Sequence, residues 1–316
     1  MEKNSSPIAT TGHDRLISHG TSSQAGHDDL AQTIRLRLRA AGDLPGASVD
    51  QQIALLDELS TFELGRFLLE NRGLNAWWTH QLVTYLPGTA AASSKGSLEH
   101  QIFEKLPAVL ATRERFGIFR EQLQVLLKPR MTLASVPCGL MGELLLLDYA
   151  SHPDATLVGI DLDQQALNAA LALAKERGLA ERLSLRCEDA WAPSLRGAAD
   201  VLTSNGLNIY EPDDARVTAL YRSFFDMLKP GGQLVTSFLT PPPALSAQSP
   251  WNMQEIDPQA LALQHLLFVR VIEAKWSAFR THDQTAKQLE DAGFADIRFI
   301  DDRARMFPTV IARKPL

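Results

Sequence analysis

The sequence lacks the features that mark several special classes of protein. It has only two cysteines, Cys138 and Cys187, too few for a disulfide scaffold or a cysteine-rich metal site, and they suit a reducing compartment. Its best apolar run, residues 144–147, is far short of the roughly 20 residues that cross a bilayer. Positive charge is not in excess, because 31 Lys and Arg face 37 Asp and Glu. These absences count against a disulfide-rich protein, a membrane protein and a dedicated nucleic-acid binder.

The sequence does contain enough apolar residues for a substantial core. It has 316 residues, 45% of them hydrophobic, and suggests about two domains. Residues 1–28 are polar and lack the apolar centre of a secretory signal, so we expect a disordered head and a cytoplasmic protein. The irregular spacing of His13, His19 and His27 in this head does not indicate metal binding, and we expect no metal site.

Residues 29–126 have the spacing of amphipathic helices. Apolar residues recur there at three- and four-residue steps, as in Ile53, Leu56 and Leu59. Ser48 is a plausible helix start and Gly73 a plausible stop. We therefore expect an all-helical N-terminal domain of several short helices.

From residue 127 onward, short apolar runs alternate with helices, a pattern typical of a mostly parallel, doubly wound α/β sheet. The predicted strands are residues 132–136, 156–160, 183–186, 201–204, 233–239, 296–300 and 309–312. Helices are expected at 142–150, 164–177 and 214–228, with a turn at 229–232. The last two strands have no helix between them, so we expect them to pair antiparallel. The sequence thus predicts a seven-stranded sheet with an antiparallel last strand over residues 127–316.

The turn after the first predicted strand lies where an open parallel sheet places its ligand. It reads Ser-Val-Pro-Cys-Gly-Leu-Met-Gly-Glu, and its glycines, Gly139 and Gly142, present no Cβ to a ligand. The second strand ends in Asp161, 22 positions after Gly139, which is the spacing of an acid that binds ribose hydroxyls. Asp161 or Asp163 could instead cap the helix that follows.

Two later turns also carry polar residues. Asp189 follows the third strand and could accept a hydrogen bond from an exocyclic amine such as that of adenine. Ser204, Asn205, Asn208 and Tyr210 follow the fourth strand and face the middle of the ligand crevice. Loops at this place hold reacting groups.

The order of these elements, with Leu-Lys-Pro-Gly-Gly at 228–232, resembles the class I S-adenosylmethionine-dependent methyltransferases. The resemblance covers about residues 127–316 and implies S-adenosyl-L-methionine as cofactor and S-adenosyl-L-homocysteine as product. The cofactor-binding residues that we predict are Ser135, Pro137, Gly139, Gly142, Asp161, Leu162, Asp189, Ala190, Ser204 and Asn205. Ser135 replaces the family's usual acid, Pro137 replaces its first glycine, and its last glycine is displaced by one to Gly142.

The acceptor site is less defined by the sequence. Trp78 belongs to an aromatic segment that could form a lid or simply pack in the core. Arg280 could hold a substrate carboxylate, although a surface ion pair is the commoner role. With Asn208 and Tyr210, they are our candidate substrate-binding residues.

No catalytic base can be named from the sequence. His80, His265 and His282 are lone histidines, for which structural or solvated roles are commoner. Methyl transfer from a sulfonium is an in-line displacement that depends on positioning, and a carboxylate or methionine-like thioether acceptor needs no base. We expect transfer to an O, N or S atom of a small molecule.

Other functions fit part of the pattern. An NAD-dependent oxidoreductase shares the turn and the ribose acid, but would have a tighter Gly-x-Gly-x-x-Gly turn. A non-catalytic S-adenosylmethionine-binding protein could keep the fold with an altered first turn. Residues 204–207 lack the Asn/Asp-Pro-Pro-aromatic motif of many members that methylate macromolecules. We therefore expect a small-molecule substrate and neither a nucleic-acid nor a membrane partner, and leave a homodimer open.

Overall fold

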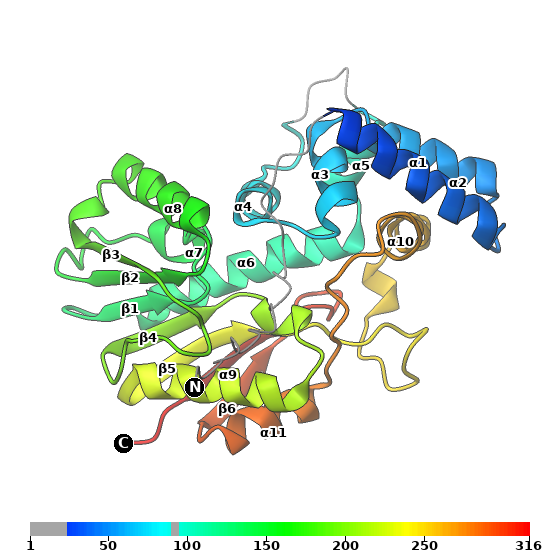
Figure 1. The fold of residues 1–316 in the computed structure, drawn as a ribbon. Helices are drawn as coiled ribbons and strands as arrows, with labels where there is room; N and C mark the ends of the chain where they lie inside the picture. The colour runs from blue at the N-terminus through cyan, green and yellow to red at the C-terminus, as the bar shows by residue number, and fades with distance from the viewer. Residues whose placement is uncertain (1–23, 90–94) are drawn as a thin grey trace, which may run out of the picture.

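The computed structural model describes residues 24–89 and 95–316, and it consists of a helix-flanked sheet and a group of helices beside it (Figure 1). The first helices are α1 Gln24–Ala41, α2 Val49–Leu59, α3 Glu63–Asn71, α4 Ala76–Thr84, α5 Leu98–Glu104 and α6 Pro107–Leu126. The later ones are α7 Gly142–Leu145, α8 Gln164–Glu176, α9 Asp214–Met227, α10 Pro258–His265 and α11 His282–Asp291. Short helical turns are η2 Ala180–Arg182, η3 Leu207–Tyr210, η4 Met253–Glu255 and η5 Leu266–Val271.

The predicted head lies mostly outside the described residues. Residues 1–23, with His13 and His19, are not among them. Residues 24–28 form the start of α1, where His27 is buried and its Nδ1 lies 3.3 Å from Glu70 Oε1.

The sheet has the order β3-β2-β1-β4-β5-β7-β6. Its strands are β1 Thr132–Ser135, β2 Thr156–Asp161, β3 Leu183–Cys187, β4 Ala199–Ser204, β5 Leu228–Ser237, β6 Ala295–Ile300 and β7 Thr309–Arg313. Strands β1 to β5 are parallel, and β7 lies antiparallel between β5 and β6. The predicted fold class is thereby confirmed. The strand order reverses between β1 and β4, and open sheets bind ligands at such a reversal.

Two local predictions were wrong. The predicted turn at 229–232 belongs to β5, whose pairing with β4 shifts register between Ala199 and Val201. A Cβ on Gly232 would lie 2.9 Å from the Lys229 oxygen, so only glycine fits this irregular stretch. The helix predicted over 142–150 is the single turn α7, because the backbone of Asp148 exchanges hydrogen bonds with the Gln124 side chain instead of continuing the helix.

The helical group has its own apolar core, built from two distant parts of the chain. Leu56, Leu64 and Leu68 pack there with Leu267 and Val271 of η5. The insertion between β5 and α11 therefore contributes to the same core as α1 to α5. Among the described residues, no helix is both long enough and apolar enough to cross a membrane.

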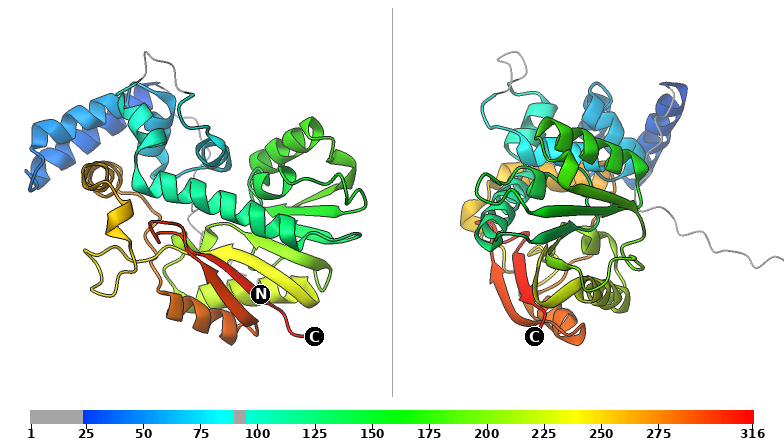
Figure 2. Two further views of the ribbon diagram at one scale, coloured as in Figure 1. Left: turned by 180° about the vertical axis from the view of Figure 1, so that it is seen from behind. Right: turned by 90° about the vertical axis from the view of Figure 1, so that its left-hand side faces the viewer.

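Helix α6 joins the helical group to the sheet. Its residues belong to three apolar clusters: Val109 packs in the helical core, Ala111 beside the β5–α11 insertion, and Phe119 and Leu123 against the sheet. The view from behind shows α6 running from the helical group along the sheet (Figure 2). Residues near its middle therefore lie where the two parts meet.

Candidate functional site

A cavity of about 1420 Å³ lies between the carboxyl ends of the parallel strands and the helical group. Its floor comes from the segments that follow β1, β2, β3 and β4, and its other walls come from α3, α4, α6 and the insertion after β5. The cavity is at the reversal of the strand order, as expected for a ligand site in this architecture. It is large enough for a nucleoside cofactor together with a second small molecule.

Asp161 organises the sheet side of this cavity. Its Oδ2 accepts a hydrogen bond from the Gly139 backbone N–H at 2.8 Å, and its Oδ1 accepts one from the Asp163 N–H at 2.9 Å. These bonds fix the carboxylate at the end of β2, and each oxygen can accept a further hydrogen bond from a ribose hydroxyl. Asp163 caps α8, with its Oδ1 accepting from Gln165 N–H at 2.9 Å. The capping role therefore belongs to Asp163, while Asp161 lines the cavity.

The two glycines of the first turn face helix α4. Gly139 has a positive φ of 50°, and a Cβ there would lie 3.4 Å from the Ala76 Cβ. A Cβ on Gly142 would lie 2.8 Å from His80 Nδ1. Both glycines line the cavity, but their missing side chains let α4 approach the sheet. The close approach that we predicted at this turn thus involves the protein's own helix.

Most of the predicted cofactor residues line one cavity. They are Pro137, Gly139, Gly142, Asp161, Leu162, Asp189, Ala190 and Asn205. Ser135 and Ser204 are buried behind that lining, with 1% and 2% of their surfaces exposed.

Of the four predicted substrate-binding residues, one lines the cavity and three do not. Tyr210 lines the cavity, whereas Trp78 packs against the helical core and Asn208 donates a hydrogen bond to the Tyr221 hydroxyl at 3.0 Å. Arg280 also lies outside the lining, with 3% of its side chain exposed.

Arg280 holds the loop after β4 in place. Its Nε donates to Asp214 Oδ1 at 2.9 Å, and its Nη1 and Nη2 donate to the backbone oxygens of Asn208 and Glu211 at 2.9 and 2.7 Å. The guanidinium thus connects η3 to the start of α9.

Only one of the three histidines singled out from the sequence lines the cavity. This is His80 of α4, and burial lowers the pKa of its imidazole below the ordinary value. Neutral imidazole is the form that can accept a proton. His265 lies in α10 away from the lining, and His282 Nε2 lies 3.0 Å from Asp301 Oδ1.

Sequence reasoning missed the buried carboxyl group of Glu143. It accepts hydrogen bonds from Ser135 Oγ at 2.5 Å and Thr203 Oγ1 at 2.8 Å, and it lines the cavity. Glu143 thus places an acid beside the position where the family usually has one and this chain has Ser135. The missing acid at Ser135 was the signal that could have led to it.

Burial raises the pKa of Glu143, so the free energy of unfolding should depend on pH. Between the ordinary pKa and the raised one, the folded protein keeps a proton that the unfolded chain releases, so rising pH destabilises the fold. Glutamine can accept the same hydroxyl hydrogen bonds without a charge. We expect the melting temperature of Glu143→Gln, relative to the unchanged protein, to rise between about pH 5 and about pH 8 in thermal denaturation. If the melting temperature of Glu143→Gln fell relative to the unchanged protein over this pH range, the raised pKa of Glu143 would be contradicted.

Sequence reasoning also missed Arg115 of α6. Its side chain lines the cavity with 4% of the residue exposed, and no motif marks it because it lies in the middle of a long helix. Burial lowers the pKa of its guanidinium to about 10, so the group is charged at neutral pH. Arg115 reaches the cavity because α6 packs over the sheet, and the sequence does not show that packing.

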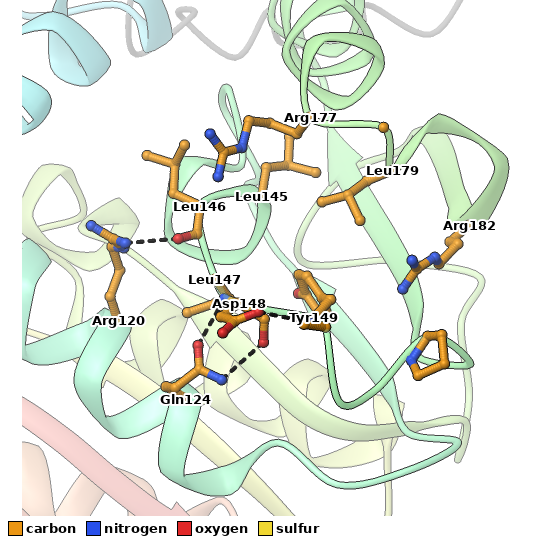
Figure 3. Close-up of a pocket in the computed structure, with 13 residues that line it drawn as sticks. Arg120, Gln124, Leu145, Leu146, Leu147, Asp148, Tyr149, Arg177, Leu179 and Arg182 are labelled. Carbon is orange, nitrogen blue, oxygen red and sulfur yellow. Dashed lines mark hydrogen bonds between the residues drawn. The ribbon is translucent and has the colours of Figure 1, made fainter.

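A second, smaller cavity of about 550 Å³ lies at the opposite edge of the sheet (Figure 3). It is lined by residues that precede β2 and β3 and by one side of α6, including Arg120, Arg177 and Arg182. Arg120 Nη2 donates to the Leu146 oxygen at 2.7 Å, and Arg182 Nη1 donates to the His152 oxygen at 3.3 Å. None of the site residues predicted from the sequence lines this cavity.

Comparison with known proteins agrees with the geometry of the larger cavity. A family model described as a methyltransferase domain matches residues 137–232, from the first turn into β5. Nocamycin O-methyltransferase from Saccharothrix syringae is 30% identical over 178 residues, which are 54% of this chain and 61% of that protein. This chain therefore spans less than two thirds of that curated relative.

Two solved structures share the fold. The crystal structure of a possible exported protein from Bordetella parapertussis is 57% identical, covers 94% of this chain and 98% of that one, and has a TM-score of 0.89. The S-adenosylmethionine-dependent methyltransferase SibL is 16% identical, with coverage of 84% and 74% and a TM-score of 0.52, a likeness of fold alone. Strand order, cavity and family match agree, and residues 137–232 are identified as a methyltransferase domain, a kind of domain whose cofactor is S-adenosylmethionine.

Proposed function

We propose that the protein transfers a methyl group from S-adenosylmethionine to an O, N or S atom of a small molecule. One observation carries the proposal: a single cavity joins the Asp161 turn to a chamber walled by the helical group. A cofactor on the sheet side would then have its acceptor enclosed on the other side, with water excluded. NAD-dependent hydride transfer is the weaker alternative, because the matched family model is a methyltransferase domain.

The residues at the sheet side suit this cofactor. The Asp161 carboxylate can accept ribose hydroxyls, and Asp189 lies beside Ala190 where an adenine amine could be bound. Asn205 Oδ1 is buried and has no hydrogen-bond partner among the described residues, so it can accept a hydrogen bond from an amine of the cofactor or acceptor. Ser135 and Ser204 would support these residues from behind the lining.

The transfer itself needs little beyond placement. S-adenosylmethionine supplies an electrophilic methyl group on a sulfonium. The acceptor atom forms a bond to the methyl carbon as the carbon–sulfur bond breaks, and the electron pair of that bond stays on sulfur. The protein's task is to align the acceptor and exclude water. An acceptor that loses a proton can give it to His80, whereas a carboxylate or thioether needs no base.

The helical group would serve as the lid of this site. Residues of α3, α4 and α6 close the cavity over the strand ends, and a small molecule fits this enclosure better than a macromolecule does. We propose residues 29–126 as the lid domain, residues 127–316 as the cofactor domain, and the cytoplasm as the location. The 57% identical relative is described as a possible exported protein, so the location needs its own test, and cell fractionation provides it.

Labelled methyl transfer tests the proposed function. The purified protein is incubated with S-adenosylmethionine carrying a tritiated methyl group and a cell extract, which is then divided by ultrafiltration. We expect enzyme-dependent label in the low-mass fraction. Label confined to retained protein or nucleic acid would contradict the small-molecule acceptor. S-adenosylhomocysteine binding without transfer to any fraction would support the non-catalytic alternative.

A further inference from the structure

The inner part of the cavity contains a charged side chain with an unusual environment. Arg115 Nη1 donates to Ser237 Oγ at 3.1 Å, and the guanidinium carbon lies 5.1 Å from the centre of the Phe307 ring. Its Nε is buried without a hydrogen-bond partner in residues 24–89 and 95–316. A buried donor left without a partner costs free energy, and a ligand that supplies the acceptor would offset that cost.

The charge of Arg115 is not cancelled by a contact within the protein. Across the described ranges, no carboxylate lies within ion-pair distance of it, and the acid that acts on it most strongly is Asp302. The Asp302 carboxylate is itself used by the backbone, accepting from Phe307 N–H at 2.7 Å and Met306 N–H at 3.3 Å. A buried cation without a contacting anion is costly, and an anionic ligand would offset that cost.

Arg115 lies in the part of the cavity where the methyl acceptor would bind. A Cβ on Gly206 would lie 4.0 Å from Arg115 Nη1, so the guanidinium is beside the turn after β4. The nearby lining is apolar, with Phe116, Ile209 and Phe307. Four acids of the cofactor side lie in the segments after β2 and β3: Asp161, Asp163, Glu188 and Asp189. An anionic group would be repelled from that side and attracted to Arg115.

We propose that Arg115 anchors a carboxylate of the methyl acceptor, which makes the substrate a small, largely apolar carboxylic acid. The inference rests on the proposed function and names its substrate class. A guanidinium binds the planar carboxylate through two parallel hydrogen bonds, and the Nε that has no partner among the described residues is one of the two donors on such a face. One cation suits a monoanion better than a phosphate, because Arg216, also in the lining, already pairs with Glu211 at 2.6 Å.

Matched acids and amides test this anchor. Phenylacetate and phenylacetamide, benzoate and benzamide, and indole-3-acetate and indole-3-acetamide are titrated into protein saturated with S-adenosylhomocysteine. We expect at least one acid to bind about tenfold or more tightly than its amide. In Arg115→Met this preference should fall to about twofold or less, while affinity for S-adenosylhomocysteine stays within about threefold.

A matched control comes from the same helix. Arg113 donates to the backbone oxygens of Leu82 and Phe103 at 3.0 and 2.7 Å and does not line the cavity. Arg113→Met should therefore keep the preference for the acid. Arg115→Lys should keep part of it, because the charge remains but the paired donors are lost.

A second measurement needs no variant. The Nε–H signal of Arg115 in a nitrogen-15 NMR spectrum should shift when the acid is added and stay in place when the amide is added. Equal binding of acids and amides, no binding of any acid at about 10 mM, or a preference that survives in Arg115→Met would overturn the anchor. Failure to bind S-adenosylhomocysteine would instead overturn the proposed function.

Discussion

Replacing Asp161 with alanine should lower the affinity for S-adenosylhomocysteine about 100-fold, or roughly 2.7 kcal/mol. The carboxylate would contribute charged hydrogen bonds to ribose, and each such bond is worth about 1.5–3 kcal/mol. The same substitution leaves the backbone N–H groups of Gly139 and Asp163 without their acceptor, which loosens the first turn and the start of α8. Isothermal titration calorimetry measures the change directly.

The control for this variant is Asp154→Asn. Asp154 is exposed in the loop before β2, at the opposite edge of the sheet, so its substitution removes a charge of the same sign without touching the cavity. The affinity of Asp154→Asn for S-adenosylhomocysteine should stay within about twofold of that of the unchanged protein. Asp161→Ala with full affinity and an unchanged melting temperature would remove Asp161 from the cofactor site.

Replacing Gly65 with alanine should destabilise the helical group by about 3 kcal/mol or more. Gly65 is buried in α3, and a Cβ there would lie 2.0 Å from the backbone oxygen of Leu59 at the end of α2. The contact is with backbone, so no side-chain rotation relieves it, and α2 and α3 would have to separate. Chemical denaturation monitored by circular dichroism measures the loss.

Gly117→Ala is the matched substitution in α6, the helix that joins the helical group to the sheet. Gly117 lies in α6, and nothing is within 4 Å of the Cβ it would gain. Alanine has the higher helix propensity, so this variant should gain up to about 1 kcal/mol. Equal effects of the two substitutions would show that the close contact of α2 with α3 is not a constraint on folding.

The parts of the fold with local signals were predictable. Strands β1 to β4 are apolar runs between helical patterns, and their order along the chain limits how a parallel sheet can be built. The antiparallel pairing of β6 with β7 follows from the short connection between them. Asp161 was recognisable because its position after a strand and its spacing from Gly139 are both visible in the sequence.

The parts that depend on tertiary contacts were not predictable. Arg280 and Trp78 have residue types that suit a substrate site, but the fold directs the first to the η3 loop and the second to the helical core. Arg115 shows the reverse: it stands in an ordinary helical context, and only the packing of α6 over the strand ends brings it to the cavity. The sequence shows the residue type of each side chain, but it does not show where the fold directs that side chain.

Calorimetric titration with S-adenosylhomocysteine and, separately, with NAD tests the central claim most directly. We predict a one-to-one complex with S-adenosylhomocysteine at about micromolar Kd, near −8 kcal/mol, and no heat from NAD beyond dilution. Binding of NAD with no response to S-adenosylhomocysteine would contradict the account, because the Asp161 turn would then serve a dinucleotide and hydride transfer would replace methyl transfer.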